Sequence, residues 1–220
     1  MKRIIITTIA LIVISNTVGY SQEYSEDYAN AITKACYELV NPDVIYDGSY
    51  KRISYPMGDV PSDRGVCTDA VIRAFRKIGY DFQEEVHRSM LRNREKNDTL
   101  IVDGKEFEVR PYTGEVIDSN INHRRVWTLA KFLKYSCFPW RCCVIPWKAV
   151  DVKSKKFPAG TLIIWDMGGG QGHVGIVIDG ENCFHQVCCG QVIEPVLHAW
   201  KIVGAYYMTG GYYYYLNNIE

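Results

Sequence analysis

The chain has 220 residues, and its 25 Lys and Arg residues balance 25 Asp and Glu residues, so the formal net charge is zero. This balance excludes a strongly basic nucleic-acid-binding protein, because such proteins carry clustered positive charge. The length is sufficient for one sizeable domain with a hydrophobic core.

The first 21 residues have the pattern of a cleaved export signal. Lys2 and Arg3 precede an apolar run over residues 4–18, and Gly19 and Ser21 suit the minus-three and minus-one positions of a signal-peptidase site. A single membrane anchor is the alternative, but the run is shorter than the roughly 20 residues that cross a bilayer. We therefore expect a periplasmic or secreted protein with no membrane span after cleavage.

Two helices are predicted in the first part of the mature chain. Residues 24–40 have apolar side chains at helical spacing and end before Asn41-Pro42, where proline disfavours helix. Residues 67–78 form the second helix, and Gly79 suits its C-terminal cap. The apolar stripe of the second helix consists of Cys67, Val71, Ala74, Phe75 and Ile78, and its basic residues lie on the opposite side.

The rest of the chain predicts an insertion followed by a sheet. Residues 81–157 are polar and rich in turns, and we interpret them as an insertion within one domain that spans residues 22–220. From residue 160 onward, "TLIIW", "HVGIVID", "CFHQV" and "AYYM" have strand-like patterns between Gly-rich turns. We expect an α+β fold in which the helix at residue 67 packs on an antiparallel sheet containing residues 161–165, 173–178 and 183–187.

Cys67 in "RGVCTDA" stands at the start of the second helix. A helix N-terminus lowers the pKa of a thiol, because its free N–H groups and the helix dipole favour the thiolate. Cys67 is therefore a candidate nucleophile. The alternative is a small buried packing residue, which is what a free cysteine usually is.

Two downstream histidines supply a candidate base and its partner. His173 follows a glycine-rich loop at the mouth of a strand, where a general base is both accessible and rigidly held, and His185 lies on the next strand. If the intervening loop has three residues, His185 lies opposite or diagonal to His173 and can orient its ring. A two-residue turn at Asp179-Gly180 would put the histidines on opposite faces.

The eight cysteines of an exported chain suggest disulfides. We predict that Cys142 or Cys143 pairs with Cys188 or Cys189, which would link the insertion to the sheet. A zinc site is the alternative at the one place where suitable ligands crowd together, residues 183–189, but their spacing is not typical of zinc. We expect neither a metal nor a cofactor.

These motifs resemble the NlpC type of bacterial cell-wall cysteine peptidases, which have a compact papain-like fold. Tyr55 stands twelve residues before Cys67, as the tyrosine of that family does, and "HVGIVID" through "FHQ" matches its histidine strand and the next polar position. The motifs "YPMGDVP", "GVCTDAVIRA", "NINHRR" and "GHVGIVID" also resemble a family of exported bacterial proteins known mainly as a domain of unknown function, over residues 45–208. Ala205 departs from that family, which has histidine there.

The resemblance implies an exported cysteine peptidase or amidase that hydrolyses a peptide amide, in peptidoglycan stem peptides, and acts as a monomer. Cys67 would attack, His173 would act as base, His185 would orient it, and Tyr55 would stabilise the oxyanion. One alternative is a non-catalytic module that binds the cell wall or a partner, with Cys67 in a disulfide. Another is an acyltransferase or deamidase that uses the same site.

The segment "SNINHRR" contributes candidate substrate-binding residues. An arginine presents a forked donor that matches a carboxylate, so this segment suits a carboxylate-bearing substrate. The alternative is a turn and helix start, with the arginines in surface ion pairs. The residues that we assign to substrate binding are Asp69, Asn122, His123, Arg124 and Arg125.

Overall fold

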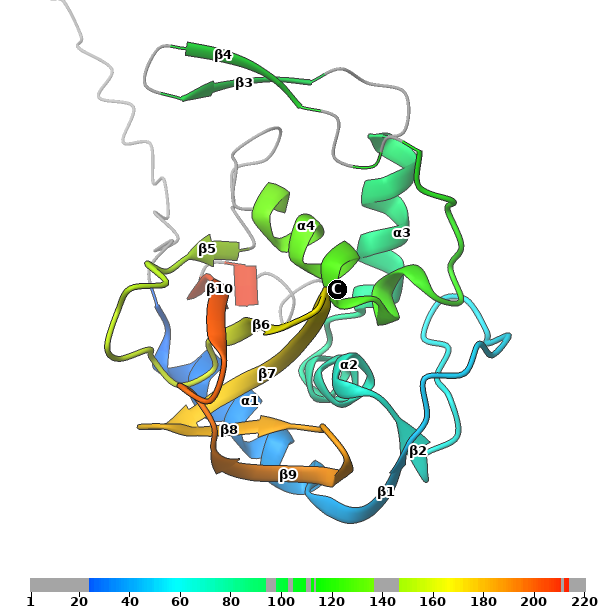
Figure 1. The fold of residues 1–220 in the computed structure, drawn as a ribbon, viewed down its shortest axis with the longest axis vertical. Coiled ribbons are helices and arrows are strands. Elements are labelled where there is room, and N and C mark those ends of the chain that lie inside the picture. Colours follow the sequence, from blue (N-terminus) through cyan, green and yellow to red (C-terminus); the bar gives the residue numbers. More distant parts are fainter. Residues whose placement is uncertain are drawn as a thin grey trace, which may run out of the picture.

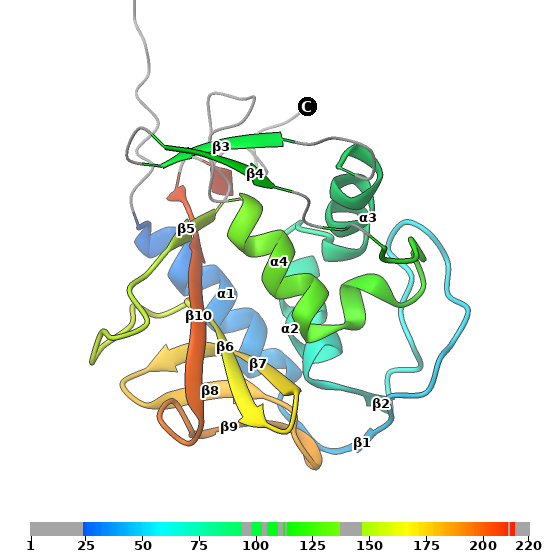
Figure 2. The ribbon, with the colours of Figure 1, turned by 45° about the horizontal axis from the view of Figure 1, so that its top comes forward.

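A computed structural model describes residues 24–93, 98–102, 105–109, 112, 114–136, 147–210 and 212–213. The predicted export signal at residues 1–21 lies outside these ranges. Within them, no helix has the length and apolar character needed to cross a membrane. The fold is mixed α+β, with helices packed on a curled eight-stranded sheet (Figures 1 and 2).

The two predicted N-terminal helices are confirmed. Helix α1 spans Glu26–Leu39, and the Ser25 hydroxyl caps its first turn by accepting from the backbone N–H of Tyr28. Helix α2 spans Cys67–Lys77 and is followed by Gly79, whose φ of 85° is the left-handed conformation expected after a helix. Helix α2 is buried over most of its surface, because α1 and the sheet pack on it.

The main sheet has the strand order β2-β1-β9-β8-β7-β6-β10-β5. Neighbouring strands are antiparallel except for β1 and β2. The predicted antiparallel sheet around residues 161–187 is thus confirmed, and β9 is an additional strand. The strands are β1 (Asn41–Tyr46), β2 (Arg64–Gly65), β5 (Trp147–Ala149), β6 (Leu162–Gly168), β7 (Gln171–Asp179), β8 (Asn182–His185), β9 (Cys189–Pro195) and β10 (Lys201–Met208).

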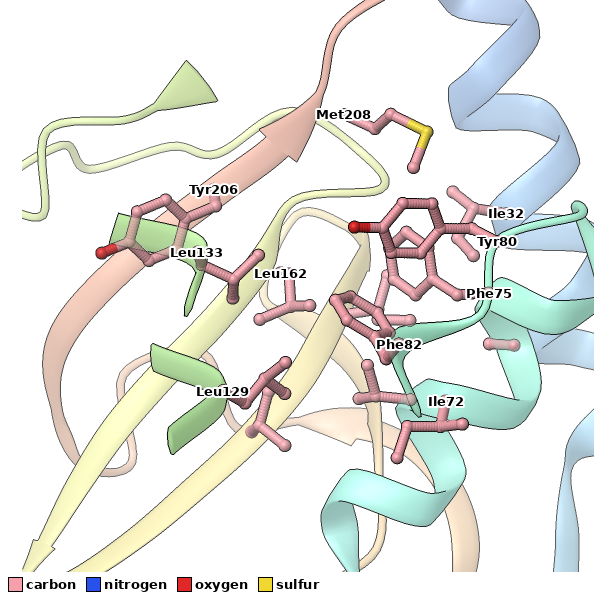
Figure 3. Close-up of a cluster of buried hydrophobic side chains, with 14 of the residues drawn as sticks. Ile32, Ile72, Phe75, Tyr80, Phe82, Leu129, Leu133, Leu162, Tyr206 and Met208 are labelled. Carbon is pink, nitrogen blue, oxygen red and sulfur yellow. The ribbon is translucent and has the colours of Figure 1, made fainter. Parts of the chain in front are cut away.

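The alternation of side chains along the strands gives the sheet two apolar faces. Val174, Ile176 and Phe184 belong to the larger core. Helices α1 and α2 complete this core with side chains such as Ile32 and Ile72 (Figure 3). Trp165 and Val177 point to the other face, where a second, smaller cluster forms. This parity decides on which side of the sheet each polar residue of β7 and β8 lies.

Three described elements within residues 81–157, the segment that we predicted to be a polar insertion, contribute to the larger core. Helix α3 (Phe82–Arg92) and helix α4 (Val126–Ser136) supply Phe82 and Leu129, and β5 supplies Trp147. Figure 3 shows Phe82 and Leu129 among the packed side chains. The same segment contains the short helix η1 (Asn122–Arg124) and a separate hairpin, β3 (Asp98–Val102) and β4 (Lys105–Val109), which lies apart from the main sheet (Figure 1).

Candidate active site

Cys67 is the first residue of α2 and lines a pocket of about 400 Å³. Only 3% of the residue is exposed, so Cys67 is almost fully buried. Short elements from distant parts of the chain meet here, namely the end of β1, the loop that contains η1, and the start of β7. The other lining residues are Tyr46, Gly48, Tyr50, Val66, Ile121, Arg124, Arg125, Val126 and Gly172.

The Cys67 thiol is free, and its electrostatic environment has two opposing parts. Burial raises its pKa to about 12, while the backbone N–H groups of Val174 and Thr68 act in the opposite direction. The expected net lowering of the thiol pKa by the helix N-terminus is therefore not found, because burial outweighs the backbone donors. At neutral pH the resting sulfur is a thiol.

His173 and His185 form a buried hydrogen-bonded pair. Nε2 of His173 lies 3.0 Å from Nδ1 of His185, and the two residues are 1% and 0% exposed. Gly175 is the direct partner of His185 across the two strands, so His173 is diagonal to it on the same face. The predicted diagonal arrangement is confirmed.

The turn between the two histidines explains their shared face. Asp179 pairs with Asn182, which leaves a two-residue loop, and a register shift lies between Val177 and Asp179. A tight turn alone would place the histidines on opposite faces, but the bulge adds one residue to β7 and restores the alignment. The sequence does not reveal this bulge.

Tryptophan rings enclose the histidine pair. The His173 ring stacks on Trp165 with centroids 5.4 Å apart, and Trp200 lies edge-on to both histidines. Burial lowers the pKa of His173 to about 3, with a smaller contribution from the neighbouring His185. The imidazole of His173 is therefore neutral across the physiological pH range, as a general base has to be.

The backbone at the start of β7 lies close to Cys67 on both sides of His173. Gly172 lines the pocket with Cys67, and the N–H of Val174 points to its sulfur, so His173 lies between two residues in contact with the pocket or the thiol. Within the part of the chain that the structure describes, the Cys67 thiol and the His173 imidazole do not form a hydrogen bond. His173 points toward Trp165, whereas Val174 faces the core beside α2.

The structure places Tyr46, rather than Tyr55, next to the thiol. Tyr55 is 43% exposed, its ring packs edge-on to His87 at 5.0 Å, and it does not line the pocket. Tyr46 ends β1 at the pocket, where burial and the adjacent Cys67 raise its pKa to about 12. In the sequence, only its place before the Asp47-Gly48 turn marks Tyr46.

Asp69 and Arg124 form a buried ion pair. The Arg124 guanidinium donates from Nε and Nη2 to the two carboxylate oxygens of Asp69, at 2.7 and 2.9 Å, and both side chains are at most 3% exposed. Asp69 also accepts from the backbone N–H of Val66, at 2.8 Å, in the first turn of α2. Its predicted role in substrate binding has no support in these contacts, which hold the η1 loop against α2.

The remaining residues of "NHRR" divide into buried and exposed groups. Asn122 bonds to the backbone of its own loop at Val116 and Asp118, and His123 is 2% exposed with its pKa lowered to about 3 by burial and Arg76. Neither lines the pocket. Arg125 is exposed and lines the pocket, and its role in substrate binding stays a prediction.

Glu194 of β9 was not identified from the sequence. Its Oε1 lies 3.0 Å from Nε2 of His185, on the side of the ring away from His173. The strand that carries Glu194 had not been predicted, so nothing in the sequence placed this carboxylate near the histidines. The predicted disulfides fall on Cys142 and Cys143, which lie outside the described residues.

Two similarities to known proteins extend over most of the chain. The chain is 32% identical over 184 residues to the uncharacterized protein YijF of Escherichia coli (strain K12), and the match covers 80% of each chain. Residues 33–208, from α1 to the end of β10, match the profile described as "Domain of unknown function (DUF1287)". The chain thus belongs to the DUF1287 family.

Proposed function

We propose that this protein is an exported cysteine hydrolase of papain-like, NlpC-type fold that cleaves a peptide amide bond in peptidoglycan. The observation that carries the proposal is the position of the Cys67 sulfur, which lies in a pocket at a helix N-terminus and receives the N–H of the residue after His173. The histidine pair adds an oriented base at the same strand. The proposed nucleophile and the strand that carries the proposed base are thus in contact through the backbone of β7, while the two histidine rings lie on the other face of the sheet.

The proposed reaction starts from a neutral thiol and a neutral imidazole. As the Cys67 sulfur attacks the carbonyl carbon, its proton passes to His173, which then gives it to the leaving amine. Water hydrolyses the acyl-enzyme in a second round that uses the same base. The His173 ring lies with Trp165 on one face of the sheet and Cys67 lies in the core on the other face, so this reaction requires the start of β7 to rearrange when substrate binds.

The oxyanion that forms on the carbonyl oxygen needs donors at the pocket. The N-terminus of α2 supplies backbone N–H groups, and the Tyr46 hydroxyl lies beside the same sulfur. We therefore transfer to Tyr46 the role expected of Tyr55.

The charge of the pocket favours a substrate that carries a carboxylate next to the scissile bond. The two arginines are the charged residues among those that line it, and Asp69 neutralises Arg124. Arg125 is exposed and provides the remaining positive charge. Stem peptides of peptidoglycan combine such carboxylates with amide bonds, and an exported protein would meet them in the periplasm or outside the cell.

The test is mass analysis of peptidoglycan fragments after incubation with the mature protein. We expect cleavage by the wild type, loss of nearly all activity in Cys67→Ala and His173→Ala, and a smaller loss in His185→Ala, which removes an orienting group. Cys183→Ala is the matched control, because Cys183 is another buried free cysteine outside the pocket. Cleavage by Cys67→Ala at the wild-type rate would refute the proposal.

A second candidate is a non-catalytic module that binds the cell wall or a partner. It is favoured by the raised pKa of Cys67 and by the missing thiol–imidazole hydrogen bond. Under this alternative, the wild type and Cys67→Ala would bind peptidoglycan equally well and leave its fragments unchanged. An acyltransferase or deamidase would instead change the mass of a fragment without cutting the peptide.

A further inference from the structure

His185 is held between two partners, one at each ring nitrogen. Nδ1 lies 3.0 Å from Nε2 of His173, and Nε2 lies 3.0 Å from Oε1 of Glu194. Glu194 pairs directly with Cys183 across β8 and β9, so its side chain shares a face with His185, two residues along β8. The His185 side chain is fully buried, whereas the Glu194 side chain is 47% exposed.

We infer that Glu194 is a positioning residue that sets the tautomers of both histidines and leaves Nδ1 of His173 without a hydrogen. An ionised carboxylate only accepts hydrogen bonds, so Nε2 of His185 has to donate to Glu194. A neutral imidazole carries one N–H, so Nδ1 of His185 accepts from Nε2 of His173. The remaining nitrogen, Nδ1 of His173, is then the one that can take up a proton.

The surroundings of the two rings keep them in the neutral form that this reasoning needs. Burial lowers the pKa of both histidines, and Glu194 only partly offsets this effect at His185. Among the described residues, the titratable groups that act on the pair are the histidines themselves and Glu194, and Trp165 and Trp200 cover the rings with uncharged surface. The negative charge of Glu194 thus sets the direction of both hydrogen bonds.

The consequence for catalysis rests on the proposed hydrolase function. After the rearrangement of β7 that this function requires, the S–H bond of Cys67 breaks, an N–H bond forms at Nδ1 of His173, and the sulfur electron pair attacks the carbonyl carbon. The positive charge that appears on His173 is stabilised through His185 by the carboxylate of Glu194. With the opposite tautomers, Nδ1 of His173 already carries a hydrogen and cannot accept the thiol proton.

The first test is ¹⁵N NMR of the histidine side chains in the full mature protein at neutral pH, which does not require any activity. We expect the wild type to show the Nε2–H tautomer for both His173 and His185. Glu194→Gln has nearly the same shape but can donate as well as accept, so we expect the Nδ1–H tautomers to appear at both rings. Glu194→Asp keeps the charge and should retain the wild-type pattern in part, and Glu181→Gln, in the adjacent turn, should leave it unchanged.

The second test is the rate of peptidoglycan cleavage by the same variants. We expect Glu194→Gln to lower kcat about 10- to 100-fold with little change in KM, the loss that removal of a histidine's orienting partner causes in metal sites. Nδ1–H tautomers in the wild type, or unchanged tautomers in Glu194→Gln, would overturn the inference. Failure of the hydrolase proposal is distinguishable, since it would abolish the difference between wild type and Cys67→Ala while the tautomers still report on Glu194.

Discussion

Removal of the Asp69 carboxylate is expected to destabilise the protein severely. Asp69→Ala leaves the Arg124 guanidinium buried without its partner, and it also removes the acceptor for the N–H of Val66 in the first turn of α2. Breaking a buried ion pair from one side typically costs about 3–5 kcal/mol. Because the free energy of unfolding of a domain is about 5–15 kcal/mol, this loss is a large part of the total stability.

The assay is urea unfolding followed by tryptophan fluorescence, with the free energy of unfolding compared at an unchanged m-value. The matched control is Glu38→Ala, which breaks the exposed ion pair with Lys77 and should cost less than about 1 kcal/mol. The double variant Asp69→Leu/Arg124→Met removes both charges and should recover much of the loss. An Asp69→Ala protein as stable as Glu38→Ala would refute the assignment of a buried structural ion pair.

Four further predictions test other parts of the structure. Folded-state pKa values of about 3 for His173 and His123, against about 6.5 when unfolded, mean that stability present above pH 6.5 is lost as the pH falls. The free energy of unfolding should fall by about 2 kcal/mol per histidine between neutral pH and pH 5. His173→Gln should therefore reduce the pH dependence of the free energy of unfolding. An unaltered dependence would contradict the lowered pKa of His173. Gly190→Ala should prevent stable folding, because the added Cβ would lie 2.4 Å from Cα of Pro42 at a φ of 75°. Gly180→Ala is the control, since the space around Gly180 is open, and it should cost about 1–2 kcal/mol of stability. Equal thermal midpoints for the two variants would show that β9 does not approach β1 so closely. Phe82→Ala should lower the free energy of unfolding in urea by about 3–5 kcal/mol. Leu91→Ala, on the exposed side of α3, should lower it little. Similar losses in the two variants would mean that α3 is not part of the core. If the pocket binds a carboxylate, Arg125→Gln should raise KM about tenfold with little change in kcat, and Arg88→Gln on α3 should not; a loss confined to kcat would argue against a binding role.

Local patterns in the sequence were sufficient for the elements that local interactions determine. The spacing of apolar residues identified α1 and α2, and Gly79 marked the end of α2. The alternation in "HVGIVID" identified β7. Each of these signals arises within a few residues of chain, where side-chain period and backbone conformation are coupled.

The candidate site depended on contacts between distant segments, which the sequence could not supply. Tyr46, on β1, lies next to Cys67, and Glu194, on β9, lies next to His185. Neither strand had been predicted in that position. The pKa of Cys67 illustrates the same limit. The helix N-terminus is a local feature that lowers the pKa, but burial by the rest of the fold is larger and acts in the opposite direction.

The bulge between Val177 and Asp179 makes the hairpin of β7 and β8 intolerant of a change in length by one residue. One deleted or inserted residue near the turn reverses the side-chain parity of β8 relative to β7, so His185 would face the core beside α2 and Phe184 would face the tryptophans. Only paired changes, two residues at once or one on each strand, preserve the contact between the histidines. Related chains should therefore be aligned here by even steps, and a relative whose hairpin differs by a single residue should be examined for a compensating bulge.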